Sequence, residues 1–106
     1  IELNHISAGP IQYDYESRSC QINNQEVKLT KREAQVLEVL LFAKGRVVSK
    51  QTLIHSVWGI DFDGDHNIID VYIGYLRRKI AQAQENSLLE TIRGVGYRLK
   101  DPHESA

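Results

Sequence analysis

The 106-residue sequence lacks long hydrophobic runs, a second cysteine and an initiator methionine. Because it has neither a run of about eighteen apolar residues nor a charged-then-apolar leader, we expect no membrane span and no signal peptide. Cys20 is the single cysteine, so an internal disulfide is excluded, which fits a reducing cytoplasm, and we expect a structural thiol. The start at Ile1 indicates a piece of a longer protein, with residues 1–5 as the remnant of a linker.

Groups that could carry out catalysis are few and scattered. The sequence has no glycine-rich phosphate-binding loop and no His/Cys spacing typical of a metal site. The histidines fall on different expected elements: His5, His55, His66 and His103. An enzyme is therefore the least favoured of three hypotheses, and we predict no catalytic residue, no metal and no cofactor.

The alternating aspartates Asp61, Asp63 and Asp65 invite comparison with a calcium-binding loop. In an EF-hand pattern that starts at Asp61, a glycine should occupy position 66 and a glutamate position 72. His66 and Tyr72 stand there instead, so we reject calcium. The segment is either an acidic loop that contacts a protein partner or a solvated linker.

The composition, with 42% hydrophobic and 25% charged residues, is that of one ordinary globular domain. A formal net charge of -1 argues against nucleic-acid binding, but the charges are segregated along the chain. Of the 13 Lys and Arg residues, six lie between Arg77 and Lys100, where only Glu85 and Glu90 oppose them. We therefore expect a locally basic face on a neutral domain.

Short β-prone segments alternate with turn-forming residues in the first part of the chain. Gly9-Pro10 and Asn23-Asn24 are typical turn formers, and the intervals between them suit antiparallel hairpins. The expected strands are residues 3–8, 11–15, 19–22 and 25–29. Together they predict a small antiparallel sheet.

The first helix is predicted from its cap. Thr30 and Glu33 form a capping-box pattern, which contributes roughly 1 kcal/mol, and Gly45 is a natural stop. The inward stripe of this helix is Ala34, Leu37, Leu40 and Leu41.

A shorter second helix follows, capped by Ser49 and ended by Gly59. Trp58 lies at core spacing from Ile54, so we predict that its ring anchors the core and does not stack on a ligand.

A third helix, over residues 66–82, carries two different faces. One narrow apolar stripe at helical spacing is expected to be buried: Ile69, Ile73, Leu76 and Ile80. The opposite arc consists of Asn67, Asp70, Val71, Gly74, Tyr75 and Arg78, flanked by Tyr72, Arg77 and Lys79. This mixture suits a DNA major groove, where cations meet phosphates and short groups meet base edges, although many such arcs are simply solvated.

The last β-prone segment has two arms around Gly94-Val95-Gly96 and predicts a terminal hairpin. We expect Ile92, Tyr97 and Leu99 to turn to one side of the hairpin. The other side would then be exposed and basic, with Thr91, Arg93, Arg98 and Lys100. Residues 81–87 read as a polar loop, and residues 101–106 as a polar tail.

The order and spacing of these motifs closely resemble the winged-helix effector domains of the OmpR/PhoB type. The matching residues are Val57-Trp58-Gly59, Ile69-Asp70-Val71-Tyr72-Ile73, Leu76-Arg77-Arg78-Lys79-Ile80 and Thr91-Ile92-Arg93-Gly94-Val95-Gly96-Tyr97-Arg98. The resemblance implies an α+β winged helix-turn-helix domain over residues 6–100. Its parts would be an N-terminal antiparallel sheet, three helices and a C-terminal β-hairpin wing.

The resemblance also implies a function: the output domain of a two-component response regulator, in the cytoplasm. A phosphoaccepting receiver domain would lie upstream, and a sensor kinase would control it. Members of this family typically bind double-stranded promoter DNA as tandem dimers on direct repeats. Because no long exposed apolar stripe is left over, we expect the isolated domain to be a monomer that dimerises on DNA.

Carried over position by position, the resemblance makes residues 67–80 the recognition helix and residues 91–98 the wing. Base readout falls on Asp70, Val71, Gly74 and Tyr75. DNA-backbone contact falls on Asn67, Tyr72, Arg77, Arg78, Lys79, Thr91 and Arg93. Residues 59–66 become a loop for contact with RNA polymerase, with Asp61, Phe62, Asp63 and Asp65 as its candidate residues.

Three positions depart from the basic members of the family, because Asn67, Gly74 and Tyr75 stand where others often carry arginine. Each lost phosphate contact lowers the log–log salt slope by roughly 0.9, so we expect a shallow salt dependence and a promoter sequence of its own. Gly74 costs a helix about 1 kcal/mol relative to alanine, so it either permits close approach to DNA or is merely tolerated. The competing hypothesis is a winged-helix module that binds a protein through the acidic loop and the outer helix face.

Overall fold

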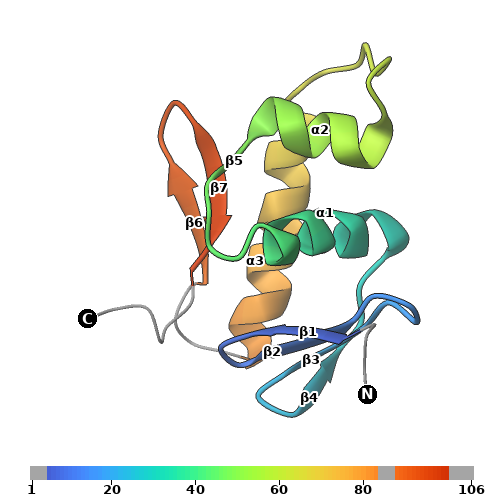
Figure 1. The fold of residues 1–106 in the computed structure, drawn as a ribbon, viewed down its shortest axis with the longest axis vertical. Helices are drawn as coiled ribbons and strands as arrows, with labels where there is room; N and C mark the ends of the chain where they lie inside the picture. Colours follow the sequence, from blue (N-terminus) through green and yellow to red (C-terminus); the bar gives the residue numbers. More distant parts are fainter. Residues whose placement is uncertain (1–4, 84–87, 101–106) are drawn as a thin grey trace.

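A computed structural model of the chain describes residues 5–83 and 88–100. It contains a four-stranded sheet, three helices and a C-terminal hairpin in that order (Figure 1). The first sheet consists of β1 (His5–Ala8), β2 (Ile11–Asp14), β3 (Ser19–Ile22) and β4 (Gln25–Val27). The helices are α1 (Lys31–Phe42), α2 (Lys50–Trp58) and α3 (Ile68–Ala83), and the remaining strands are β5 (Val48–Ser49), β6 (Leu89–Ile92) and β7 (Gly96–Leu99). The predicted architecture is therefore confirmed.

Some predicted boundaries shift. β1 begins at His5, inside the predicted strand 3–8 and at the last residue of the predicted linker remnant 1–5, and α3 extends beyond the predicted recognition helix to Ala83. The rest of the predicted linker, part of the predicted loop before the wing, and the predicted tail lie outside the described residues (1–4, 84–87 and 101–106).

The N-terminal sheet is an antiparallel meander in the order β1-β2-β3-β4. Its tight turn at Asn23 and Asn24 uses positive φ angles of 53° and 65°, which asparagine tolerates better than most residues. One face of the sheet packs on the core, to which β2 and β3 supply the buried residues Ile11, Tyr13, Cys20 and Ile22. Cys20 is therefore a structural thiol, and its burial raises the pKa to about 11.

The predicted capping box of α1 is present. The Thr30 side chain accepts from the Glu33 N–H, and the Glu33 carboxylate accepts from the Thr30 N–H. The helix ends at Phe42, three residues before the predicted stop, because the chain already turns to positive φ at Lys44 and Gly45. All four predicted inward residues are buried, and so is Val36.

The second helix begins after Ser49, whose side chain accepts from the Thr52 N–H, and ends at Gly59 with a φ of 103°. Trp58 is half-buried and packs against the core as predicted. Arg32 of α1 also holds this end of α2, because its guanidinium donates to the Val57 carbonyl at 2.5 Å and lies 5.5 Å from the centre of the Trp58 ring.

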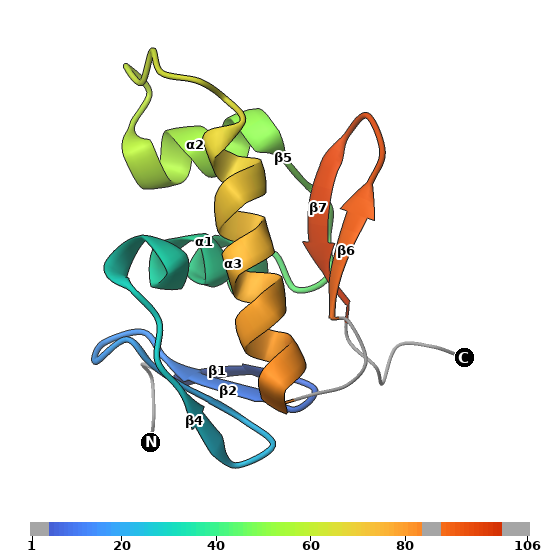
Figure 2. The ribbon, with the colours of Figure 1, turned by 180° about the vertical axis from the view of Figure 1, so that it is seen from behind.

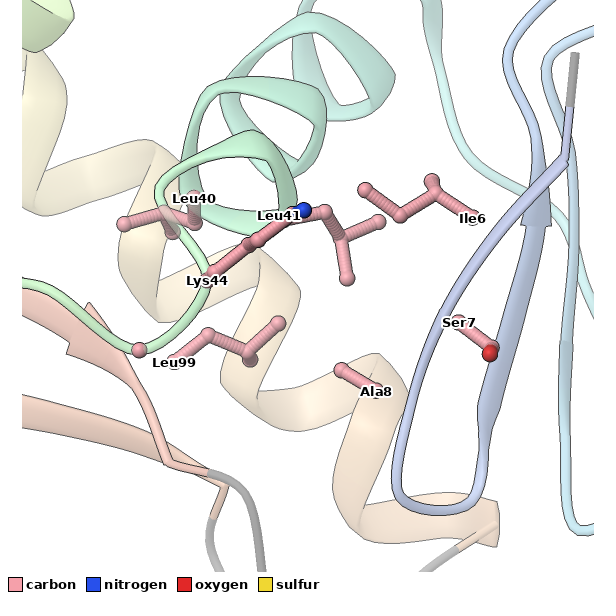
Figure 3. A pocket seen from close by; sticks show the side chains of 8 residues that line it. Ile6, Ser7, Ala8, Leu40, Leu41, Lys44 and Leu99 are labelled. Carbon is pink, nitrogen blue, oxygen red and sulfur yellow. The ribbon is translucent and has the colours of Figure 1, made fainter. Parts of the chain in front are cut away.

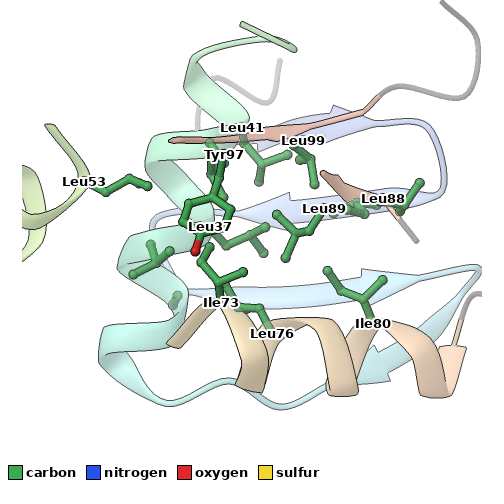
Figure 4. Packing of buried hydrophobic residues seen from close by; sticks show 14 of the residues in the cluster. Leu37, Leu41, Leu53, Ile73, Leu76, Ile80, Leu88, Leu89, Tyr97 and Leu99 are labelled. Atoms are coloured by element: carbon green, nitrogen blue, oxygen red, sulfur yellow. The ribbon is translucent and has the colours of Figure 1, made fainter. Parts of the chain in front are cut away.

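The long helix α3 runs past α1 and places its last turns on the N-terminal sheet, with the wing beside its first half (Figures 1 and 2). Its predicted stripe is buried without exception: Ile69, Ile73, Leu76 and Ile80. This stripe packs between α1 and the wing, together with Leu37, Leu89 and Leu99 (Figure 4). The opposite face of α3 is left open to solvent.

The predicted phase of the wing hairpin is right for β7, where Tyr97 and Leu99 are buried, and wrong for β6. In the observed register Thr91 pairs with Tyr97, and cross-strand partners share a face, so Thr91 lies on the side of Tyr97, toward Arg77 of α3, although it stays exposed. Ile92 correspondingly pairs with Gly96 on the outer face. Alternation along a strand fixes only which residues share a face, and the packing against α3 decides which face is inside.

The wing is also broader than predicted, because the two-residue strand β5 pairs with β7. Gly96 makes this close pairing possible: a Cβ atom there would lie 2.0 Å from the Val48 carbonyl oxygen. The hairpin is therefore one part of a three-stranded sheet in the order β5-β7-β6.

Candidate nucleic-acid interface

The open side of α3 presents two large apolar side chains to solvent. Val71 is 47% exposed and Tyr75 39% exposed, on a helix whose other large aliphatic residues face inward or sit at its ends. Gly74 lies between them, and a Cβ atom built there would have no described neighbour within 4 Å. We refer to Val71, Gly74, Tyr75 and Arg78 as the outer face of α3.

A row of rings supports this outer face from behind. Tyr72 is half-buried and makes edge contacts with Trp58 at 5.3 Å and with Tyr75 at 5.5 Å between ring centres. The Arg78 guanidinium lies 5.3 Å from the centre of the Tyr75 ring, so it is drawn along the same face. Tyr75 is consequently held on two sides although its ring is exposed.

Asp70, the predicted base reader in the first turn of α3, is engaged within the protein. The Tyr97 hydroxyl of β7 donates to its Oδ1, and Nζ of Lys50 lies 3.2 Å from both carboxylate oxygens. Partial burial by itself would raise the pKa of Asp70, but the bonds from Tyr97 and Lys50 outweigh it and hold the pKa below its usual value. For Tyr97, burial and the nearby carboxylate raise the pKa to about 12.

Arg77, about two turns further along α3, makes a second connection to the wing. Its guanidinium donates to the Leu89 carbonyl, with Nε at 3.4 Å, and to the Thr91 hydroxyl. It also lies 5.9 Å from the centre of the Tyr97 ring. The predicted backbone-contact residues Arg77 and Thr91 therefore bind each other.

Lys79 is turned away from the outer face. Its ammonium nitrogen lies 2.5 Å from Oε1 of Glu33 and 2.9 Å from the Lys28 carbonyl oxygen, so it joins α3 to the start of α1. Glu33 is only 4% exposed. Lys79 thus neutralises a buried carboxylate, which is a structural role that differs from the predicted phosphate contact.

The wing tip carries exposed groups on a tight turn. The Val95 N–H donates to the Ile92 carbonyl, and Gly94 provides the positive φ of 79° that the third position of such a turn requires. Arg93 and Val95 are exposed at this tip. An open cleft of about 400 Å³ separates it from the start of α2, lined by Ser49, Lys50, Gln51, His66, Gly94 and Val95.

The acidic loop between α2 and α3 is only partly free. Asp61, Asp63 and Asp65 are exposed, and Asp65 accepts from the backbone N–H of Asn67 before α3 begins. Phe62 instead folds back to 6.1 Å from the Trp58 ring, and it packs so closely over Gly64 that a Cβ there would clash. The loop is therefore anchored by its aromatic residue and presents its carboxylates.

The other notable hollow lies away from α3, between β1 and the end of α1 (Figure 3). Its volume is about 220 Å³, below the few hundred Å³ typical of ligand sites, and its lining is mostly aliphatic. It is lined by Ile6, Ser7, Ala8, Leu40, Leu41, Lys44, Gly45 and Leu99. Within the described ranges, every helix is too short or too polar to traverse a bilayer.

Two residues of this surface were missed from the sequence. Lys50 carries no motif, and its relevance depends on the position of Asp70, which lies 20 residues away. Tyr97 is buried on the side of the hairpin predicted for it, but no sequence pattern predicts that its hydroxyl binds Asp70. The one available signal was the place of Lys50 directly after the Ser49 cap.

The chain matches a known family over most of its length. The family described as "Transcriptional regulatory protein, C terminal" matches residues 24–99. The transcriptional regulatory protein PrrA of Mycobacterium tuberculosis is 45% identical over 95 residues, which is 90% of this chain and 41% of PrrA. This chain thus spans about two fifths of the length of that relative.

Solved structures of similar domains have the same fold as this chain. The C-terminal domain of the nisin resistance regulator NsrR superposes with a TM-score of 0.75 at 33% identity, covering 92% of this chain and 98% of that one. The DNA-binding domain of the response regulator AdeR, crystallised in complex with an intercistronic region, gives 0.77 at 25% identity and covers 91% and 99%. The chain therefore belongs to the family of OmpR/PhoB-type winged-helix domains that form the C-terminal, DNA-binding part of transcriptional regulatory proteins.

Proposed function

We propose that this domain binds promoter DNA sequence-specifically by placing the outer face of α3 in the major groove. The observation that carries the proposal is the exposure of Val71 and Tyr75 beside Arg78, on a helix whose remaining stripe is buried. Exposed apolar groups next to a cation match the thymine methyl groups, base edges and phosphates of a groove. Support also comes from AdeR, which was crystallised with DNA.

Within this proposal, base readout belongs to Val71, Gly74 and Tyr75. Gly74 lets the helix approach the bases closely, because no side chain stands between it and solvent. Asp70 is left out of base readout, because its carboxylate already has two protein partners. The absence of an arginine at Tyr75 removes the commonest bidentate contact to guanine, so the target site should differ from those of basic relatives.

Backbone contact belongs first to Arg78 and Arg93, the exposed cations of α3 and of the wing tip. Asn67 stands exposed just before α3 and can donate to a phosphate. Phosphate contacts are also proposed for Tyr72, Arg77 and Thr91. Each of these side chains already has a contact within the protein, so only its remaining polar groups can bind DNA. We leave Lys79 out, because its charge is used on Glu33.

We place the domain in a response regulator with an upstream receiver domain, a cognate sensor kinase and a cytoplasmic location. This rests on relatives such as PrrA, which are more than twice as long as the part that this chain matches. We also propose that the domain is monomeric alone and binds direct repeats as a tandem dimer, as members of this family typically do. We propose that RNA polymerase contacts the exposed aspartates Asp61, Asp63 and Asp65, and that Phe62 anchors their loop.

The test begins with selection of the domain against a random duplex pool, followed by anisotropy of the selected duplex at several salt concentrations. Replacing both Arg78 and Arg93 by alanine should weaken binding to every duplex and lower the salt slope by about 0.9 per lost phosphate contact. Lys44→Ala is the matched control, because it removes a cation from a hollow that no α3 residue lines. If the pool yields no motif and the double variant binds duplex DNA like the wild type, the hypothesis of a protein-binding module is favoured instead.

A further inference from the structure

Five side chains connect the recognition helix to the wing in two adjacent layers. In the first, Asp70 of α3 accepts from Tyr97 of β7 and from Lys50 of α2. In the second, Arg77 of α3 donates to the Thr91 side chain and the Leu89 backbone of β6. We refer to Asp70, Tyr97, Lys50, Arg77 and Thr91 as the wing clamp.

We infer that the wing clamp fixes the direction of the wing relative to α3, and that Asp70 is a positioning residue of the proposed DNA interface and not a reader of bases. The carboxylate is held by two protein donors: Nζ of Lys50 lies 3.2 Å from each of its oxygens, and Oδ1 also accepts from Tyr97. A carboxylate that reads cytosine must instead accept from the base N4 amino group. The bonds to Tyr97 and Lys50 instead direct the carboxylate toward β7 and α2.

The wing needs such a connection because its tip has little support of its own. Arg93, Gly94 and Val95 are exposed, and β6 forms an edge of its sheet. The third strand, β5, pairs with β7 only at Gly96 and Tyr97, so it does not pair with the tip residues. Tyr97 is separated from the tip by Gly96 alone, so a bond from its hydroxyl to α3 restrains β7 close to the tip.

The clamp affects how the DNA contacts of α3 and of the wing tip add in the free energy of binding. If α3 and the wing tip bind neighbouring parts of one duplex, the second contact is intramolecular, and its benefit depends on the wing being already in place. A loosened clamp should therefore reduce what Arg93 contributes, even though Arg93 itself is unchanged. This inference rests on the proposed function, because it assumes that the wing tip touches DNA.

The experiment is a double-mutant cycle on the selected duplex. Tyr97→Phe removes the hydroxyl and keeps the buried ring, and Arg93→Ala is measured in the wild-type and Tyr97→Phe backgrounds. We expect the loss caused by Arg93→Ala to be smaller in the Tyr97→Phe background, by a factor of about three or more. Tyr13→Phe is the matched control, because that buried hydroxyl also donates to a carboxylate, Glu38, but within the N-terminal sheet and α1.

Asp70→Asn tests the positioning role directly and serves as a second variant if Tyr97→Phe does not fold. It should bind most duplexes more tightly, because a negative charge is lost near phosphates, but repeat selection should return the wild-type motif. It should also reduce the Arg93→Ala factor as Tyr97→Phe does. A changed preference at one base pair would make Asp70 a base reader and overturn the inference.

The outcomes separate the inference from the function on which it rests. If Arg93→Ala weakens binding equally in all backgrounds, the wing contacts DNA but the clamp does not position it. If Arg93→Ala has no effect in the wild type, the proposed wing contact fails. In that case backbone ¹⁵N relaxation of the domain without DNA tests whether the wing clamp holds the wing. The order parameters of Gly94 and Val95 should fall in Tyr97→Phe and not in Tyr13→Phe. Unchanged order parameters in Tyr97→Phe would overturn the inference.

Discussion

Nζ of Lys79 lies 2.5 Å from Oε1 of Glu33, so an ion pair joins the second half of α3 to the first turn of α1. The same carboxylate closes the capping box with Thr30. Glu33 therefore stabilises a helix start and a helix–helix contact at once, from a nearly buried position.

Glu33→Gln should lower the free energy of unfolding at neutral pH by about 1–3 kcal/mol, because Lys79 loses a charged acceptor while the amide can still cap Thr30. Burial alone would raise the pKa of Glu33, but Lys79 and Thr30 outweigh it and hold the pKa below its usual value of 4.5. The contribution is then complete above about pH 4.5 and is lost as the pH falls through the folded-state value. Urea unfolding at several pH values should show that Glu33→Gln and Lys79→Gln lose less stability at acid pH than the wild type does. The same loss in both variants as in the wild type would contradict this prediction.

Gly74→Ala should make the domain more stable and its DNA complex weaker. No described atom lies within 4 Å of the added methyl group, so the helix gains up to about 1 kcal/mol, or about 4–8 °C in Tm. In the groove the same methyl group occupies space that the proposed close approach needs. Thermal unfolding and anisotropy on one preparation would measure both effects, and unchanged affinity would mean that Gly74 is merely tolerated.

Val71→Ala and Tyr75→Ala should each relax the sequence preference at one position of the binding site by about 1–3 kcal/mol, because each removes an apolar group placed against a base edge. The salt slope should stay as in the wild type, since neither residue is charged. Competition binding with single-base variants of the selected duplex is the measurement. Tyr75→Phe keeps the ring contacts with Tyr72 and Arg78, so it shows whether the hydroxyl is read.

Arg32→Ala should lower the free energy of unfolding by about 1–2 kcal/mol and shift the emission of Trp58, the single tryptophan. The guanidinium both binds the Val57 carbonyl and stacks on the Trp58 ring, so its loss leaves the end of α2 open. Lys31→Ala is the control, because it removes an exposed cation from the neighbouring position. Equal effects of the two variants would show that charge, and not the capping contact, is responsible.

Cys20 should not react with Ellman's reagent at about pH 8 in the folded domain. Its thiol is 1% exposed, and burial raises its pKa to about 11, so both access and thiolate are lacking. In denaturant the reaction should be complete within minutes. Rapid modification of the native domain would show that the N-terminal sheet opens readily.

The sequence by itself determined every helix, the four N-terminal strands and the inward stripe of α3. Thr30 and Ser49 act within their own first turns, and Ile69, Ile73, Leu76 and Ile80 repeat at the helical period. These signals are local, because a cap and a hydrophobic stripe depend on residues three or four positions apart. The same local pattern, together with the order of the motifs, was enough to identify the family.

Only the tertiary structure decided which polar groups of α3 remain available to a partner. Arg77, Lys79 and Asp70 look alike as polar residues of the solvent arc, but each meets a group that lies 12 to 46 residues away along the chain. Likewise, alternation in β6 left two phases open until packing against α3 placed Thr91 on the same face as Tyr97. Such pairings arise from where separate elements cross, and no local spacing encodes that crossing.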